Sequence, residues 1–209
     1  MMMKLLEVRA RIRVLYQKFE LYINPVVKFV IALIVFQVIN SSLGSDPRFL
    51  RFPVVLLLSL VCAFLPSSVM VFLAGVVSLV HIYYVSPMLV ILAALIFLVL
   101  YLFFIRFTPG LGYVLLAVPI LHVLGIPYVV PILMGLFSTP IAILPTSCGV
   151  IIYYLFRIIR EAAARQVNLA IEDILQLYTD VIDSLFANQL MFMTIAVFAV
   201  VILAVYLIR

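Results

Sequence analysis

The acidic residues of this 209-residue chain all lie outside its long apolar stretches. These residues are Glu7, Glu20, Asp46, Glu161, Glu172, Asp173, Asp180 and Asp183. Ionisable groups inside a membrane are costly and usually serve ion or proton pathways, so their absence from the apolar stretches argues against carboxylate-based coupling. For the same reason, the apolar stretches lack the paired acids that hydrolysis by general acid–base catalysis needs.

Two histidines and a group of hydroxyl side chains are the remaining candidates for a polar site. His81 and His122 have no nearby acid and no second histidine at metal-binding spacing, so each more simply bonds a neighbouring helix or lies near the membrane interface. Hydroxyls gather where the apolar stretches break, and there they can satisfy freed backbone groups. The alternative is a cavity for a polar substrate, whose candidate residues are Ser67, Ser68, His81, His122, Ser138 and Thr139.

No catalytic or cofactor motif accompanies these residues. Cys62 and Cys148 match no metal or redox spacing, and we expect them to be small buried hydrophobic residues. The sequence has no nucleophile elbow, phosphate loop or dinucleotide fingerprint. We therefore expect no enzyme, no cofactor and no metal site.

The composition indicates a polytopic all-α integral membrane protein. Hydrophobic residues make up 68% of the chain, charged residues only 10%, and the mean hydropathy is +1.41, whereas an average soluble domain is about 25% charged. A membrane helix needs about 20 mostly apolar residues. The net charge of +5 comes from basic residues beside apolar segments, which favours the positive-inside rule over nucleic-acid binding. The expected partner is therefore the lipid bilayer, most simply a bacterial plasma membrane.

About seven membrane segments are expected. Six lie in the region 25–146 and one in 189–209: Val26–Leu43, Pro53–Leu65, Val69–Tyr84, Pro87–Ile105, Leu111–Leu124, Tyr128–Leu144 and Leu190–Ile208. The short ones form pairs that are either two crossings or one re-entrant hairpin. Regions 26–84 and 87–144 each have one longer helix followed by a broken hairpin, a repeat that in transporters marks a midplane site. General enrichment of Pro and Gly in membrane helices is the alternative explanation.

Amphipathic helices are expected before and after this membrane region in the sequence. In residues 1–24, apolar side chains recur at helical spacing opposite a basic face, and Asn24-Pro25 is expected to end that helix. Gly149–Phe156 is too short to cross a membrane alone. Six preceding segments return the chain to the side of the N-terminus, and Arg157, Arg160 and Arg165 agree with the positive-inside rule, so the segment 147–188 is expected in the cytoplasm. Its helix has a heptad seam, formed by Val167, Ile171, Ile174, Tyr178, Val181 and Leu185.

The function predicted from these features is a non-enzymatic membrane subunit that assembles with itself or with partner proteins. The basic helix and the acidic heptad helix are expected to share the cytoplasmic side, so that Arg9, Arg13 or Lys18 would approach Asp173, Asp180 or Asp183. Attraction of the basic helix to anionic headgroups is an equally simple explanation. The second hypothesis is a small-solute transporter or channel component with a site at the broken helices. The last segment would then take the chain out of the cytoplasm, and the chain could be one piece of a longer protein.

Overall fold

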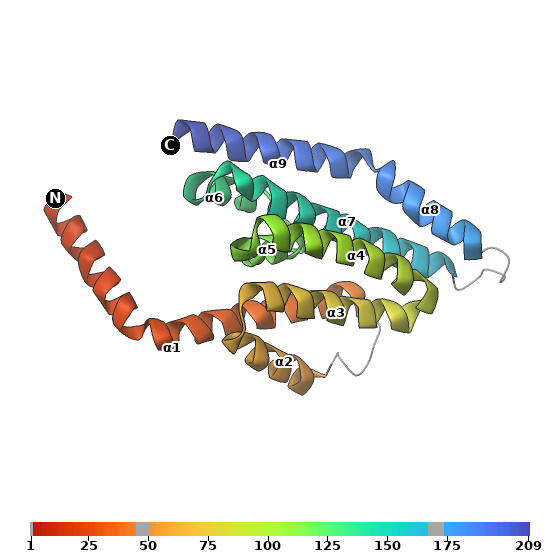
Figure 1. Ribbon diagram of the computed structural model, residues 1–209, viewed down its shortest axis with the longest axis horizontal. Helices are drawn as coiled ribbons and strands as arrows, with labels where there is room; N and C mark the ends of the chain where they lie inside the picture. The colour runs from red at the N-terminus through yellow and green to blue at the C-terminus, as the bar shows by residue number, and fades with distance from the viewer. Residues whose placement is uncertain (1, 45–50, 167–173) are drawn as a thin grey trace.

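The structure is a computed structural model that describes residues 2–44, 51–166 and 174–209. Within these ranges the chain is built from helices. The α-helices are α1 (Met2–Leu43), α2 (Phe52–Phe64), α3 (Ser67–Val85), α4 (Pro87–Phe107), α5 (Gly112–Val123), α6 (Val129–Phe137), α7 (Ile143–Gln166), α8 (Ile174–Phe186) and α9 (Gln189–Ile208). Two short 3₁₀ turns, η1 (Pro109–Leu111) and η2 (Pro140–Ala142), precede α5 and α7. Figure 1 shows an elongated bundle in which α3, α4, α7 and α9 run along the long axis.

Five helical stretches of the described chain are long and apolar enough to cross a membrane: Leu21–Leu43, Ser67–Tyr84, Leu89–Phe107, Pro140–Ala162 and Thr179–Ile208. Phe52–Phe64 and Pro109–Val123 are apolar but shorter. The predicted class, an all-α protein with several membrane helices, is therefore confirmed. The predicted number of about seven segments is not, because the short segments do not reach spanning length.

The helix α1 continues through Pro25, so the predicted helix end at Asn24-Pro25 is wrong. A proline removes one backbone hydrogen bond and displaces the preceding turn, which bends a helix without always ending it. Figure 1 shows α1 bending away from the bundle on its N-terminal side. Just after the proline, Lys28 Nζ donates a 3.1 Å hydrogen bond to the Leu65 carbonyl, which ties α1 to the end of α2.

The central helix is α7, which contributes buried side chains to both hydrophobic clusters of the core. Its close contact with α5 depends on Gly149, where an added Cβ would lie 2.7 Å from Val118 Cβ and 2.9 Å from the Leu115 carbonyl oxygen. The same arrangement recurs between α6 and α9, where a Cβ on Gly135 would lie 2.6 Å from Val205 Cβ. Small residues at such crossings let membrane helices pack closely.

The helix α7 also overturns the prediction that residues near Gly149 cannot cross a membrane. The predicted segment Tyr128–Leu144 ended just before Pro145, but Pro145 lies in the first turn of α7, where a missing amide donor costs nothing. The helix therefore extends over 24 residues. The C-terminal part of α7, whose sequence includes Arg157, Arg160 and Arg165, lies at the end of the bundle far from the N-terminus (Figure 1).

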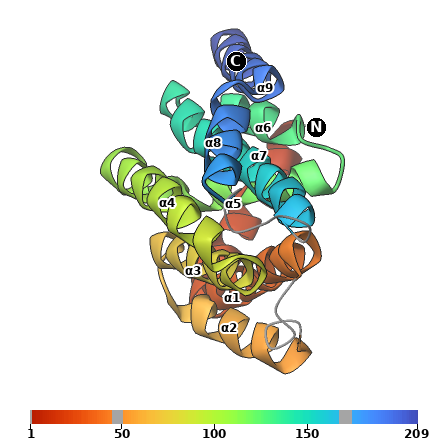
Figure 2. The same ribbon diagram turned by 90° about the vertical axis from the view of Figure 1, so that its right-hand side faces the viewer.

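The two ends of the bundle are distinct. Both termini lie at one end, which we call the termini end, and α8 lies at the other, which we call the α8 end (Figures 1 and 2). The start of α1 and α8 therefore lie at opposite ends of one subunit. The predicted shared cytoplasmic side stays a prediction, as does the pairing of Arg9, Arg13 or Lys18 with Asp180 or Asp183 within or between subunits. Asp173 lies outside the described residues. The C-terminus lies at the same end of the bundle as the N-terminus (Figure 1), and the expected placement of the two termini on opposite sides of the membrane stays a prediction.

The hairpin of α5 and α6 begins and ends at the termini end. Ser68 Oγ at the start of α3 donates a 3.0 Å hydrogen bond to the Pro109 carbonyl, and Arg209 Nη1 donates a 2.7 Å bond to the Leu136 carbonyl. With 12 and 9 residues, the helices are about 18 and 14 Å long, well below the ~30 Å thickness of a bilayer core. The re-entrant alternative for this pair stays a prediction, with which these short lengths agree.

The two halves of the predicted repeat differ in packing. In 26–84, α1 packs on both α2 and α3, whereas in 87–144, α4 packs on α3 and α7. The longer helices that begin the two halves, α1 and α4, run in opposite directions along the bundle (Figure 1). The repeat itself stays a prediction.

Candidate ligand cavity

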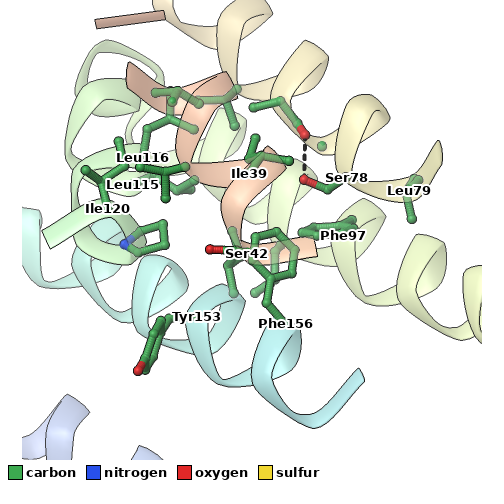
Figure 3. Close-up of a pocket in the computed structure, with 18 of the residues that line it drawn as sticks. Ile39, Ser42, Ser78, Leu79, Phe97, Leu115, Leu116, Ile120, Tyr153 and Phe156 are labelled. Carbon is green, nitrogen blue, oxygen red and sulfur yellow. Dashed lines mark hydrogen bonds between the residues drawn. The ribbon is translucent and has the colours of Figure 1, made fainter. Parts of the chain in front are cut away.

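A cavity of about 860 Å³ lies between α1, α3, α4, α5 and α7 (Figure 3). Its walls are mostly aliphatic and aromatic, with Ile39, Leu79, Phe97, Leu116 and Phe156 each coming from a different one of these helices. Ligand pockets in proteins have volumes of about 300 to 1,000 Å³ and are predominantly apolar. The cavity therefore has room for a molecule of substantial size.

Small residues of α3 create part of this space. Ala74, Gly75 and Ser78 lie within about one turn of each other and line the cavity. A Cβ added to Gly75 would meet no atom within 4 Å, so the glycine faces open space. By contrast, the space beside Gly149 at the α5–α7 crossing and beside Gly135 at the α6–α9 crossing is occupied by atoms of the neighbouring helix.

Two serine hydroxyls of the wall are bonded to the backbone of their own helices. Ser78 Oγ donates a 2.8 Å hydrogen bond to the Ala74 carbonyl, drawn as a dashed line in Figure 3. Ser41 Oγ donates a 2.9 Å bond to the Val38 carbonyl. Because these donors are engaged, the walls offer little compensation to a polar solute, whose unpaired groups would cost several kcal/mol to bury.

The cavity has one charged end, formed by Arg157, Arg160 and Glu161 of α7 beside Ser42 of α1. Arg157 Nε donates a 3.1 Å hydrogen bond to Glu161 Oε1, with side chains 58% and 55% exposed. Arg160 Nη2 donates a hydrogen bond to the Ser42 carbonyl. This contact caps the C-terminal end of α1, where carbonyls lack partners in the helix.

The cavity extends from this charged end into the bundle. Its lining runs from Ser42 back to Val35 on α1 and from Arg160 back to Ile152 on α7. At 1.5 Å per residue these stretches are about 10 to 12 Å long, close to the ~15 Å depth of one leaflet's hydrocarbon. The apolar body and the charged end thus match the depth profile of one leaflet.

The six residues predicted for a polar cavity do not line this one. Ser67 and Ser68 start α3 at the termini end, and Ser138 and Thr139 follow α6. Ser67 lies against α5, since a Cβ on Gly112 would be 3.1 Å from Ser67 Cβ. These hydroxyls therefore sit at breaks between helices, as the simpler interpretation expected.

The two histidines are also apart and locally bonded. His81, fully buried, has Nε2 2.9 Å from Asn40 Oδ1, which links α3 to α1. His122 Nδ1 lies 2.9 Å from the Val118 carbonyl, and its ring stacks on Tyr153 with centroids 4.4 Å apart. Both make contacts within the bundle, and Tyr153 is the cavity residue that His122 touches.

The heptad seam is partly covered by its own chain. Val181 and Leu185 are buried in the same cluster as Ile158 and Ala162 of α7. Ile174 and Tyr178 belong to α8, while Val167 and Ile171 lie outside the described residues. The described, buried part of the seam is therefore engaged within the subunit.

Sequence reasoning missed the cavity because its walls come from five helices. Gly75, a helix-destabilising residue inside an apolar run, was one available signal. The spacing of Arg157, Arg160 and Glu161 was another, since steps of three and four residues place charges on one helix face.

Comparison with protein-family models, with curated proteins and with solved structures finds no match for this chain.

Proposed function

We propose that this protein is a membrane-embedded binding protein for a hydrophobic or amphiphilic molecule that enters from the bilayer. The observation that supports it is the 860 Å³ cavity, apolar along its length and charged at one end. A molecule with a hydrocarbon body would replace contacts with lipid tails by contacts with the walls and would lose no hydrogen bonds. Uptake and release of such a molecule would make the protein a carrier.

The cavity favours this cargo over the small polar solute of the second sequence hypothesis. A polar solute needs convergent polar groups, and the wall hydroxyls of Ser41 and Ser78 are bonded to their own helices. The assembly hypothesis has less support, because Val181 and Leu185 pack within the subunit. Self-association through other surfaces remains compatible with carrier activity.

We also propose that the termini end faces the cytoplasm. The N-terminal part of α1, the end of α4 and the end of α9 lie at that end (Figure 1), and they contain the basic residues Lys4, Arg9, Arg11, Arg13, Lys18, Lys28, Arg106 and Arg209 and the acids Glu7 and Glu20. The start of α2, the end of α7 and α8 lie at the α8 end (Figure 1), where the described charged residues are Arg51, Arg157, Arg160 and Arg165 and the acids Glu161, Asp180 and Asp183. The positive-inside rule favours the more basic end as cytoplasmic. The charged end of the cavity would then open toward the outer leaflet.

The experiment is photolabelling of the purified protein in nanodiscs with a long-chain apolar diazirine probe. The cavity-filling variant Gly75→Phe should remove most of the specific labelling, because its ring would project into open space. Gly110→Phe is the matched control, since Gly110 is also free of neighbours within 4 Å but does not line the cavity. Equal labelling of the two variants would contradict the proposed function.

A further inference from the structure

We infer that the molecule bound in the cavity has an anionic head group, and that Arg160, assisted by Arg157, recognises it. This inference rests on the proposed function and specifies its ligand class. The two arginines lie at the one charged end of a cavity whose remaining wall is mostly apolar. A ligand that fills the body of the cavity would bring its head to that end.

The charge balance at this end favours an anion. Arg157 and Arg160 contribute two positive charges, and Glu161 contributes one negative charge, so one positive charge is uncompensated among these cavity residues. The carboxylate of Glu161 bonds Arg157, and in the part of the chain that the structure describes, Arg160 is bonded to the uncharged carbonyl of Ser42. Arg160 is therefore the cation with the greater capacity for an anionic partner.

The geometry of a guanidinium suits such a head. It has five N–H donors, and one of those on Arg160 is used by Ser42. The remaining donors can bind a phosphate or a carboxylate through two parallel hydrogen bonds. The side chains of Arg157 and Arg160 are exposed, so a head group at the membrane interface can reach them while its tail stays in the cavity.

A purely structural role for Arg160 predicts a different result. If Arg160 only caps α1, its removal would disturb the bundle and weaken binding of charged and uncharged ligands alike. If it recognises the head, its removal would weaken anionic ligands selectively. The comparison of two probes with the same tail separates the two roles.

The test uses hexadecyl phosphate and hexadecanol, each with a diazirine at the same tail position, and the protein in nanodiscs of neutral lipid. We expect the phosphate probe to bind more tightly, and Arg160→Gln to weaken it about ten-fold, the loss typical of a charge-assisted hydrogen bond. Hexadecanol binding should change less than two-fold. Arg106→Gln, which removes an exposed arginine in the last turn of α4, is the matched control and should change neither.

The other outcomes each overturn a defined statement. If Arg160→Gln weakens the binding of both probes equally, Arg160 acts only as a helix cap and does not recognise the head group. The proposed function would not be affected by that result. Displacement of the phosphate probe by inorganic phosphate alone would show a site for the free ion and would also refute it. Absence of cavity labelling by either probe in the unmodified protein would refute the proposed function itself.

Discussion

Arg160 of α7 donates a hydrogen bond to the carbonyl oxygen of Ser42 of α1, 118 residues earlier in the chain. The contact joins the two helix ends beside the charged end of the cavity. The pair supplies a partner for one carbonyl at the end of α1, and it places Arg160 beside Arg157 and Glu161 at the charged end of the cavity. It is also exposed, so water or a ligand head can replace it without burying an unpaired group.

The glycines of the membrane helices should respond oppositely to alanine. Gly75→Ala should raise the free energy of unfolding by about 0.5 to 1 kcal/mol, because the methyl group meets no neighbour and alanine is the better helix former. Gly149→Ala should lower it by about 1 to 3 kcal/mol, since the new Cβ would lie 2.7 Å from Val118 Cβ. Thermal unfolding in detergent measures both. Destabilisation by both variants would show that the space beside Gly75 is filled.

The turn between α5 and α6 should require glycine at position 125. Gly125 has φ +77°, the Gly125 amide bonds the His122 carbonyl at 3.1 Å, and the Ile126 amide bonds the Leu121 carbonyl at 2.9 Å, the pattern of a Schellman C-cap. Gly125→Ala should lower the free energy of unfolding by about 1 kcal/mol, and Gly125→Asn by less, because Asn tolerates this conformation better.

The control for this turn is Gly110→Ala, at an exposed glycine without the left-handed conformation. It should change the unfolding temperature little. Equal effects at positions 110 and 125 would argue against a glycine-dependent end of α5.

The buried pair of His81 and Asn40 should couple α1 and α3 energetically. Removing either partner leaves the other side chain with one hydrogen bond fewer inside the bundle, which costs about 1 to 3 kcal/mol. The double variant His81→Phe with Asn40→Leu should cost less than the sum of the single variants, with a coupling of about 0.6 kcal/mol or more. A double-mutant cycle by thermal unfolding gives this value, and strictly additive effects would exclude the coupling.

The positions of most helices could be predicted from the sequence. Which of these helices are long enough to cross a membrane could not. Apolar runs bounded by breakers such as Pro66 and the Thr108-Pro109-Gly110 turn correspond to α2, α3, α4 and α5. Proline was less informative inside the chain. Pro25 lies within α1 and Pro145 in the first turn of α7, because a proline is tolerated where its missing donor is not needed or where a bend is accommodated.

The candidate site was predictable only in its parts. The sequence shows Arg157, Arg160 and Glu161 at helical spacing, but α7 had to be recognised as a crossing helix before their end of the bundle was known. The cavity arises from side chains of five helices that are distant in the chain. No local pattern specifies which of those helices touch, so an empty space between them has no signature in the sequence.

The two ends of the bundle should face different compartments, with α8 outside the cell. In intact cells, a membrane-impermeant maleimide should label Ser184→Cys in α8 and should label Gly110→Cys only after lysis, because the two exposed positions lie at opposite ends. The native thiols of Cys62 and Cys148 are buried and should contribute little background. Labelling of position 110 alone would reverse the orientation, and labelling of both positions in intact cells would refute the opposite placement of the two ends.

The most direct test of the proposed function is the position of the photolabel. After illumination of the unmodified protein with the diazirine probe, peptide mass spectrometry should find the modification on cavity residues such as Leu79, Phe97 and Phe156, which come from three different helices. Such a distribution would show that the cavity holds the tail of the ligand. Labels confined to side chains on the outer surface of the bundle, such as the exposed Leu190, Val200 and Leu207 of α9, would contradict the proposed function.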